Sequence, residues 1–264
     1  MAAPTGDGHS VPHRRLAAMT TLLLLRHGRT TANASGVLAG WTPGVSLDEV
    51  GRGQAGSVAA RLAAVPLAAV VASPLDRCQE TATALVSGRD GLKLETDDRI
   101  GECRYGDWTG RGLKELAKEP LWKVVQQHPS AAVFPGPEGE GLAQTQARAV
   151  TAIREWDARI AAEHGPDAVW VACSHGDVIK AILADALGMH LDLFQRIVVD
   201  PCSVSVVRYT ETRPFVVRVN DVGGDVAALV PPKKKGRRRR AADSDAVVGG
   251  GAGGPARATP GRSD

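Results

Sequence analysis

Short apolar runs alternate with longer amphipathic segments along most of this 264-residue chain. Apolar runs bounded by turn residues predict buried strands, and apolar residues spaced three and four apart predict helices. The predicted strands are residues 20–25, 68–73, 92–97, 168–174, 203–210 and 214–221. The predicted helices are residues 46–66, 74–88, 113–127, 142–164 and 177–188. This alternation predicts an α/β domain, a three-layer sandwich with a mostly parallel central sheet flanked by helices.

Capping residues mark the ends of two of the predicted helices. Ser46, followed by Glu49 three residues later, predicts the N-cap of the first helix, and Pro66 predicts its end. Pro74 predicts the first turn of the second helix, and Gly88 its C-terminus.

The two ends of the chain differ from the middle in composition and charge. Residues 1–18 and 231–264 are rich in small, polar and basic residues without periodicity, so both predict disorder around a domain at 19–230. Nine Lys and Arg against three Asp give residues 231–264 a charge of +6, and residues 1–18 carry +1. Because the whole chain carries +3, the domain itself carries −4.

The basic run at 233–240 leaves two interpretations open. It could bind nucleic acid or another anionic surface, which would suit a non-catalytic binding protein. The simpler interpretation is a solvated tail, because such a run carries no base-reading code and suggests nucleic acid only weakly. Oligomeric state is left open, a homodimer included.

The cysteines and the N-terminus favour a cytoplasmic protein. Four cysteines without CxxC spacing suit neither a disulfide framework nor a zinc site. Residues 13–25 imitate a signal peptide, but the apolar run continues directly into Arg26-His27-Gly28 without a cleavage region. Met19 is a second candidate start, and no apolar run is long enough to span a membrane.

Three predicted strands end in residues suited to an anion. They lead into Arg26-His27-Gly28, into Ser73-Pro74 with Arg77 one turn further, and into Ser174-His175-Gly176. In open α/β sheets, ligands lie at the carboxyl ends of strands, where helix N-termini present N–H groups. Arginine binds phosphate oxygens bidentately. The three strand ends therefore predict a phosphate pocket.

Histidine adds chemistry to this pocket. Neutral imidazole can attack phosphorus, and His27 directly follows an arginine. Departure of the leaving group then needs an acid. Glu102 lies in a loop after a strand and is the first candidate, with Asp107 and Glu115 close in sequence.

At this point the chain resembles the histidine phosphatase superfamily, in its phosphoglycerate mutase-like branch. The resemblance rests on five blocks in family order: RHGRTTAN, GVSLDEVGRGQA, SPLDRCQETA, ECRYGDWTG and CSHGDVIKAIL. The blocks cover about residues 20 to 210. Five ordered blocks are far more specific than one tripeptide.

The resemblance implies a role for each matching residue. His27 becomes the transient phosphohistidine, and Glu102 is the proton donor. The phosphoryl group is bound by Arg26, Asn33, Arg77 and His175, although Asn33 could instead cap a local turn. In another branch an Asp directly follows the second histidine and serves as the acid, whereas Gly176 stands here. No metal or cofactor is implied, because arginines supply the positive charge.

The sequence block around Glu102 helps to decide whether the chain is a hydrolase or a mutase. ECRYG is similar to the ERHYG block of cofactor-dependent mutases, but Cys103 and Arg104 depart from it. RYGDWTG resembles phosphatase members, and the segment from Glu102 to His175 looks shorter than in mutases. Glu138 and Glu140 there would repel a doubly negative acid. We predict hydrolysis of a small phosphorylated metabolite, with a phosphoglycerate mutase-type phosphomutase as the alternative.

Overall fold

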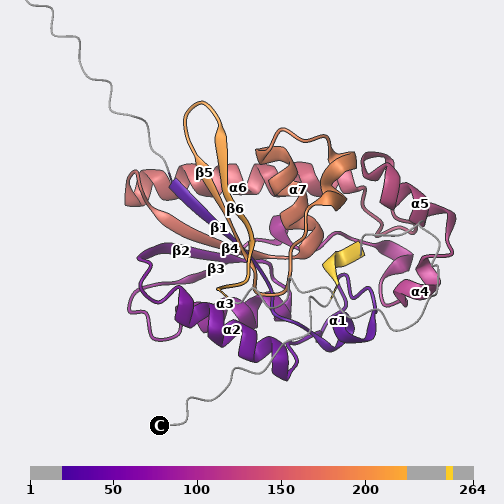
Figure 1. Cartoon of the computed structure of the whole chain (residues 1–264), viewed down its shortest axis with the longest axis horizontal. Coiled ribbons are helices and arrows are strands. Elements are labelled where there is room, and N and C mark those ends of the chain that lie inside the picture. Colours follow the sequence, from indigo (N-terminus) through magenta and orange to yellow (C-terminus); the bar gives the residue numbers. More distant parts are fainter. Residues whose placement is uncertain (1–19, 225–247, 252–264) are drawn as a thin grey trace, which may run out of the picture.

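A six-stranded sheet forms the centre of the computed structural model, which describes residues 20–224 and 248–251 (Figure 1). The strand order is β3-β2-β4-β1-β5-β6. The bounds are β1 Thr20–Arg26, β2 Leu67–Ala72, β3 Leu94–Thr96, β4 Val169–Ser174, β5 Val204–Tyr209 and β6 Pro214–Asp221. The pairs β1–β4, β2–β4 and β2–β3 are parallel, and β1–β5 and β5–β6 are antiparallel. The predicted mostly parallel α/β sheet is confirmed.

Helices cover both faces of this sheet. Their bounds are α1 Thr31–Ser35, α2 Glu49–Arg61, α3 Asp76–Val86, α4 Leu113–Leu116, α5 Pro120–Gln127, α6 Leu142–His164 and α7 Gly176–Ala186. In Figure 1, α2 and α3 lie on one face and α6 and α7 on the other. Short 3₁₀ turns lie at 98–100, 106–108, 129–131, 191–196 and 248–250.

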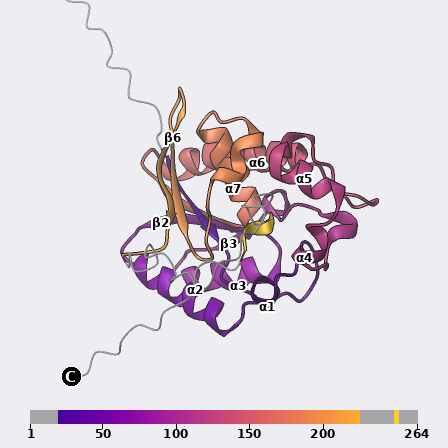
Figure 2. The same cartoon turned by 45° about the vertical axis from the view of Figure 1, so that its right-hand side comes forward.

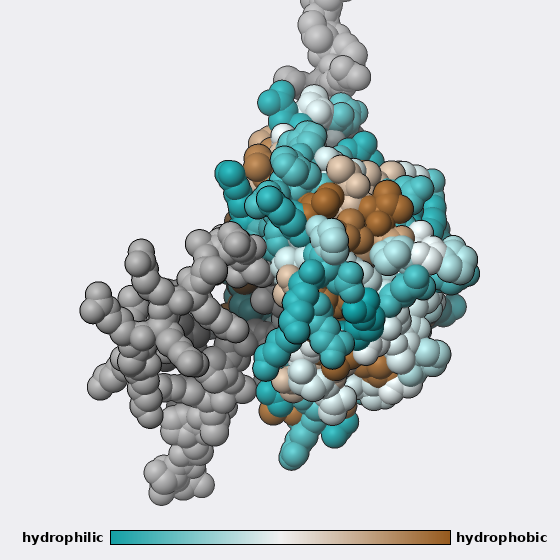
Figure 3. Space-filling view, turned by 90° about the vertical axis from the view of Figure 1, so that its right-hand side faces the viewer, coloured by the Kyte–Doolittle hydropathy of each residue, from teal (hydrophilic) through white to brown (hydrophobic). Residues whose placement is uncertain are grey.

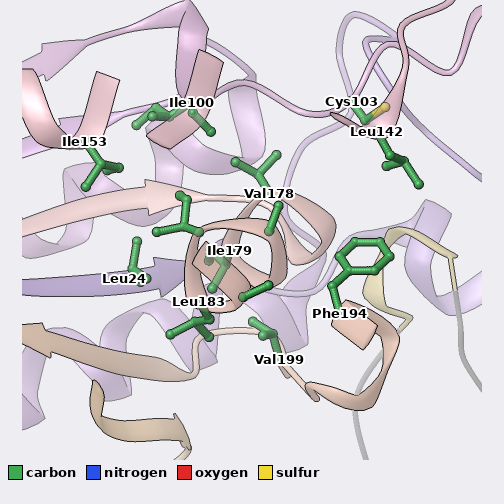
Figure 4. Packing of buried hydrophobic residues seen from close by; sticks show 14 of the residues in the cluster. Leu24, Ile100, Cys103, Leu142, Ile153, Val178, Ile179, Leu183, Phe194 and Val199 are labelled. Atoms are coloured by element: carbon green, nitrogen blue, oxygen red, sulfur yellow. The ribbon is translucent and has the colours of Figure 1, made fainter. Parts of the chain in front are cut away.

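The central strands explain the three layers, because their alternate side chains point to opposite faces. In β1, Leu22 and Leu24 pack into the cluster under α6 and α7, whereas Leu23 and Leu25 pack into the cluster under α2 and α3. Figure 4 shows Leu24 beside residues of α7 in the first cluster. A strand buried on both faces needs a continuous apolar run, which is what residues 22–25 supply.

Two of the predicted helix boundaries are displaced along the chain: α2 ends at Arg61 and not at Pro66, and α3 begins at Asp76, so Pro74 lies before its N-cap. Two others are wrong for local reasons. The N-cap of α2 is Asp48, whose Oδ1 accepts a hydrogen bond from the Gly51 amide at 2.7 Å, and not Ser46. Leu47 forms a β-bridge with Thr30, so the chain is still extended there. The predicted helix 113–127 is split into α4 and α5, because Pro120 forces the residue before it out of the helical region and starts a new helix.

Several predictions fall outside the described residues. These are the disordered segment 1–18, the domain limits at 19 and 230, and the basic run at 233–240. Most of the predicted tail 231–264 also lies outside, but Val248–Gly251 is described and packs against α7. Within the described part, no helix has the length and apolar character needed to cross a membrane.

Candidate active site

The carboxyl end of β1 delivers the two central residues of the site. Arg26 is the last residue of β1, and the His27 amide donates to the Ser174 carbonyl at 3.0 Å, which holds the chain beside β4. The next residue is Gly28, where a Cβ would lie 2.6 Å from the Gly51 carbonyl oxygen of α2. Only glycine permits this approach of the two backbones.

The His27 ring is oriented with one nitrogen free to react. Its Nδ1 lies 2.7 Å from the Gly28 carbonyl, and because a carbonyl only accepts, Nδ1 carries the proton. Nε2 therefore holds the lone pair. Burial lowers the pKa of His27 well below its usual value, and the positive charges of Arg77 and Arg26 lower it further. At neutral pH the ring is an uncharged nucleophile.

Two buried arginines supply positive charge around this ring. Arg26 is fully buried, and Arg77 is only 2% exposed in the first turn of α3. Arg77 Nη2 donates to the Gly40 carbonyl at 2.8 Å. Among the described residues, Arg26 Nε and Arg77 Nη1 have no hydrogen-bond acceptor. A buried cationic N–H needs one, and the oxygens of a phosphoryl group suit it.

His175 lies behind His27 at the N-cap of α7, with the two ring centroids 5.2 Å apart. Its Nε2 is hydrogen-bonded to Ser73 Oγ at 2.7 Å, and its Nδ1 is 3.8 Å from Glu102 Oε2. Burial lowers the pKa of His175 well below its usual value, with Arg77 adding to the effect. It is therefore a neutral residue close to both the nucleophile and the candidate acid.

Glu102 is the buried carboxyl of the site, at 4% exposed. Burial raises its pKa to about 7, with a further increase from the negative charge of Asp177. One oxygen accepts from the Cys103 amide at 3.0 Å. A carboxyl with this pKa is protonated in a large fraction of molecules near neutrality, which suits a group that gives and then takes a proton.

Asn33 is positioned by the turn it caps. Its Oδ1 accepts from the Thr30 amide at 3.1 Å in a capping box at the start of α1. The same side chain lines the cavity beside His27, Arg77 and Glu102. Capping and a place in the pocket are therefore compatible, and phosphate binding by Asn33 stays a prediction.

One buried acid of the site, Asp177, was not predicted from the sequence. Asp177 is 1% exposed in the first turn of α7, and its Oδ2 accepts from the Tyr105 hydroxyl at 3.0 Å. It raises the pKa of the neighbouring Glu102 and contributes a buried negative charge. Tyr105, the donor to Asp177, is fully buried. An acid two residues after a site histidine, at a helix start, was the available signal.

The six predicted site residues therefore meet at one end of the sheet, although they come from the end of β1, α1, α3, the loop after β3, and the N-cap of α7. The cavity has additional lining from Val37, Leu38, Ala39 and Leu113, which are apolar. Within residues 20–224 and 248–251, no group of three His, Cys, Asp or Glu is placed to hold a metal ion. A neutral histidine between arginines with a protonatable carboxyl defines a phosphoryl-transfer site.

Comparison with known proteins identifies the family. The chain belongs to the histidine phosphatase superfamily (branch 1), whose model matches residues 22–222. It is 30% identical over 197 residues to a probable phosphoglycerate mutase GpmB of Yersinia enterocolitica, covering 74% of this chain and 87% of that protein.

Solved structures agree with this assignment. YhfR of Bacillus stearothermophilus has a TM-score of 0.68 at 28% identity, covering 77% of this chain and 98% of that one. A mycobacterial glucosyl-3-phosphoglycerate phosphatase in complex with VO3 has a TM-score of 0.68 at 26% identity, covering 78% and 100%. The predicted histidine phosphatase is confirmed at the level of family and enzyme class.

Proposed function

We propose that the chain hydrolyses a small phosphomonoester through a phosphohistidine at Nε2 of His27. The carrying observation is the hydrogen bond from Nδ1 to the Gly28 carbonyl, which leaves Nε2 as the ring's basic nitrogen. The Nε2 lone pair attacks phosphorus, the bond from phosphorus to the ester oxygen breaks, and Glu102 gives that oxygen its proton.

The second half of the reaction uses the same carboxyl group in reverse. Glu102, now a carboxylate, takes a proton from a water molecule whose oxygen attacks phosphorus. The bond between phosphorus and Nε2 breaks, inorganic phosphate leaves, and Glu102 is protonated again. Arg26 and Arg77 stabilise the charge on the phosphoryl oxygens in both halves.

The lining of the cavity favours hydrolysis over a phosphoglycerate mutase reaction. Such a mutase must also bind a carboxylate, but in the described residues the cavity lining has one arginine, Arg77, and no lysine. Arg104 instead stacks on Trp41, with its guanidinium carbon 4.1 Å from the ring centroid. Glu140 does not repel a doubly negative acid as predicted, because its charge is paired with Arg148 at 2.6 Å. The side chain of Glu138 is exposed.

The names of the relatives include both mutases and phosphatases. The Yersinia relative is a probable phosphoglycerate mutase, whereas two structural neighbours are described as a putative alpha-ribazole-5'-P phosphatase and a glucosyl-3-phosphoglycerate phosphatase. The test is a panel of sugar phosphates, phosphoglycerates and nucleotide-derived esters assayed for released phosphate. A mutase assay with and without a bisphosphorylated primer runs beside it. Isomerisation that depends on the primer, without phosphate release, would refute hydrolysis.

The cysteines support the cytoplasmic location that belongs to this proposal. All four, Cys78, Cys103, Cys173 and Cys202, are buried and unpaired, which suits a reducing compartment. Fractionation of the source cells tests this.

A further inference from the structure

A short segment near the C-terminus lies directly over Arg26. Three of its carbonyl oxygens accept hydrogen bonds from the guanidinium: Gly250 from Nη1 at 2.6 Å, and Gly249 and Gly251 from Nη2 at 3.2 and 2.6 Å. Nη1 also donates to the Val199 carbonyl at 2.8 Å. Both terminal nitrogens of Arg26 are thereby fully used, and only its Nε–H has no acceptor in the described residues.

The segment Val248–Gly251 is docked by more than this arginine. The Gly249 amide donates to Asp177 Oδ2 at 2.8 Å. Val248 is 1% exposed and belongs to the hydrophobic cluster that includes Leu38 and Val178. Figures 1 and 2 show the segment, in yellow, beside α7. It therefore fits the pocket with an apolar anchor, an amide donor and a row of acceptors.

Glycines shape this contact. Gly249, Gly250 and Gly251 have φ angles of 74°, 78° and 57°, in the left-handed region where a Cβ is strained. A Cβ on Gly250 would lie 3.1 Å from Arg26 Cζ, and Arg26 cannot move aside because it is fully buried. The sequence of three glycines is thus required for the carbonyls to reach the guanidinium.

With this segment in place, the cavity beside His27 is small. It has a volume of about 20 Å³, and Val248, Gly249 and Gly251 form part of its wall. That volume is about what one water molecule needs. A phosphate group, with one phosphorus and four oxygens, is larger than a single water molecule, so this space does not hold it while the segment is in place.

We propose that Val248–Gly251 is an intramolecular competitor of the phosphoryl group, in which backbone carbonyl oxygens take the Arg26 donors that phosphoryl oxygens would otherwise use. The segment must leave before a phosphomonoester binds, so it holds the enzyme in an autoinhibited form. Only the identity of the anion as a phosphomonoester rests on the proposed function. The competition itself rests on the contacts of Arg26.

The test is the substitution Gly250→Ala in the full chain, with Gly91→Ala as the matched control. Gly91 has a φ of 76°, and a Cβ there would meet nothing within 4 Å, so it shares the backbone strain without touching the site. The added strain at Gly250 weakens docking of the segment by about tenfold. Calorimetric titration with inorganic phosphate should show binding up to about tenfold tighter in Gly250→Ala and unchanged in Gly91→Ala.

Two further measurements complete the test. The KM for p-nitrophenyl phosphate should fall by the same factor with kcat unchanged, and phosphate should speed hydrogen exchange at the amides of 248–251 in the unsubstituted chain. Phosphate binding that is unchanged or weaker in Gly250→Ala would overturn the proposal, and so would slower exchange with phosphate. Tighter phosphate binding without hydrolysis in either protein would uphold the competition and refute the proposed function.

Discussion

The substitution Glu102→Gln tests the central step of the mechanism, because it keeps the shape of the side chain and removes its proton. Glu102 has a pKa of about 7, so about half of the molecules carry the proton at neutral pH. General acid–base catalysis contributes about 10²–10⁴-fold, which is about 3–5 kcal/mol of barrier. We expect kcat for an alkyl phosphate to fall by that factor, while the affinity for inorganic phosphate changes little.

The leaving group separates this explanation from simple damage to the site. The alkoxide of an alkyl ester needs the proton, whereas p-nitrophenolate leaves without it. Stopped-flow assays of Glu102→Gln with p-nitrophenyl phosphate should therefore show a rapid burst of about one p-nitrophenol per site. Slow turnover follows the burst, because the base that activates water is also missing. Glu138→Gln is the control, since that side chain is 79% exposed and outside the mechanism. Equal losses on both esters without a burst would refute the assigned role.

Stability gives a second measurement of the same carboxyl. A raised folded-state pKa means that ionisation costs the folded protein stability as pH rises from about 4.5 to about 7. Glutamine does not ionise, so Glu102→Gln should be more stable than the unsubstituted chain at pH 8 by up to about 3 kcal/mol, and the difference should shrink at pH 5. Denaturant melts at both pH values measure it, and a pH-independent difference would contradict the buried, protonated carboxyl.

Other predictions follow from the same geometry. His27→Ala should abolish turnover, and quenched reactions should lose the acid-labile, base-stable phosphoenzyme; retained activity would contradict it. In the unsubstituted chain, kcat/KM should fall as pH rises above about 7, because Glu102 loses its proton there. Asp177→Asn should move this fall in kcat/KM to lower pH, since Asp177 raises the pKa of Glu102. Gly51→Ala should destabilise the protein by about 2 kcal/mol or more, because the new Cβ would lie 2.0 Å from a carbonyl oxygen. Gly53→Ala, in the same helix with open space, should stabilise it by about 0.5–1 kcal/mol in thermal melts.

The sequence predicted the site better than its surroundings, for a reason that lies in the sheet. Parallel strands place their carboxyl ends at one edge, so Arg26, Arg77 and His175 meet once the strand order is right. Local signals were enough to find these strands, because buried strands are continuous apolar runs. By contrast, the split at Pro120 is a local signal in the chain itself, because the residue before a proline leaves the helical region.

The rest of the site depends on contacts between distant segments. The hydrogen bonds of Asp177 to Tyr105 and to Gly249 join residues 72 positions apart in each case. A glycine-rich segment has no hydrophobic periodicity from which a docked conformation could be predicted. Val248–Gly251 was therefore predicted to belong to the disordered tail. The side of the molecule that bears α4 and α5 is mainly hydrophilic, with small separate hydrophobic areas (Figure 3).

One glycine connects the chemistry with the docked segment. The position after His175 carries an acid in another branch of the superfamily, and here it is Gly176. Gly176 carries no carboxyl group, which is consistent with Glu102 as the proposed proton donor. It also admits the segment, because a Cβ at Gly176 would lie 3.0 Å from Gly250 Cα and 3.1 Å from the Gly249 carbonyl oxygen. An acid at this position would therefore crowd Val248–Gly251, and its negative charge would face the same carbonyl oxygens. Glycine at position 176 thus suits both the assignment of Glu102 as the acid and the close approach of the segment whose carbonyl oxygens contact Arg26.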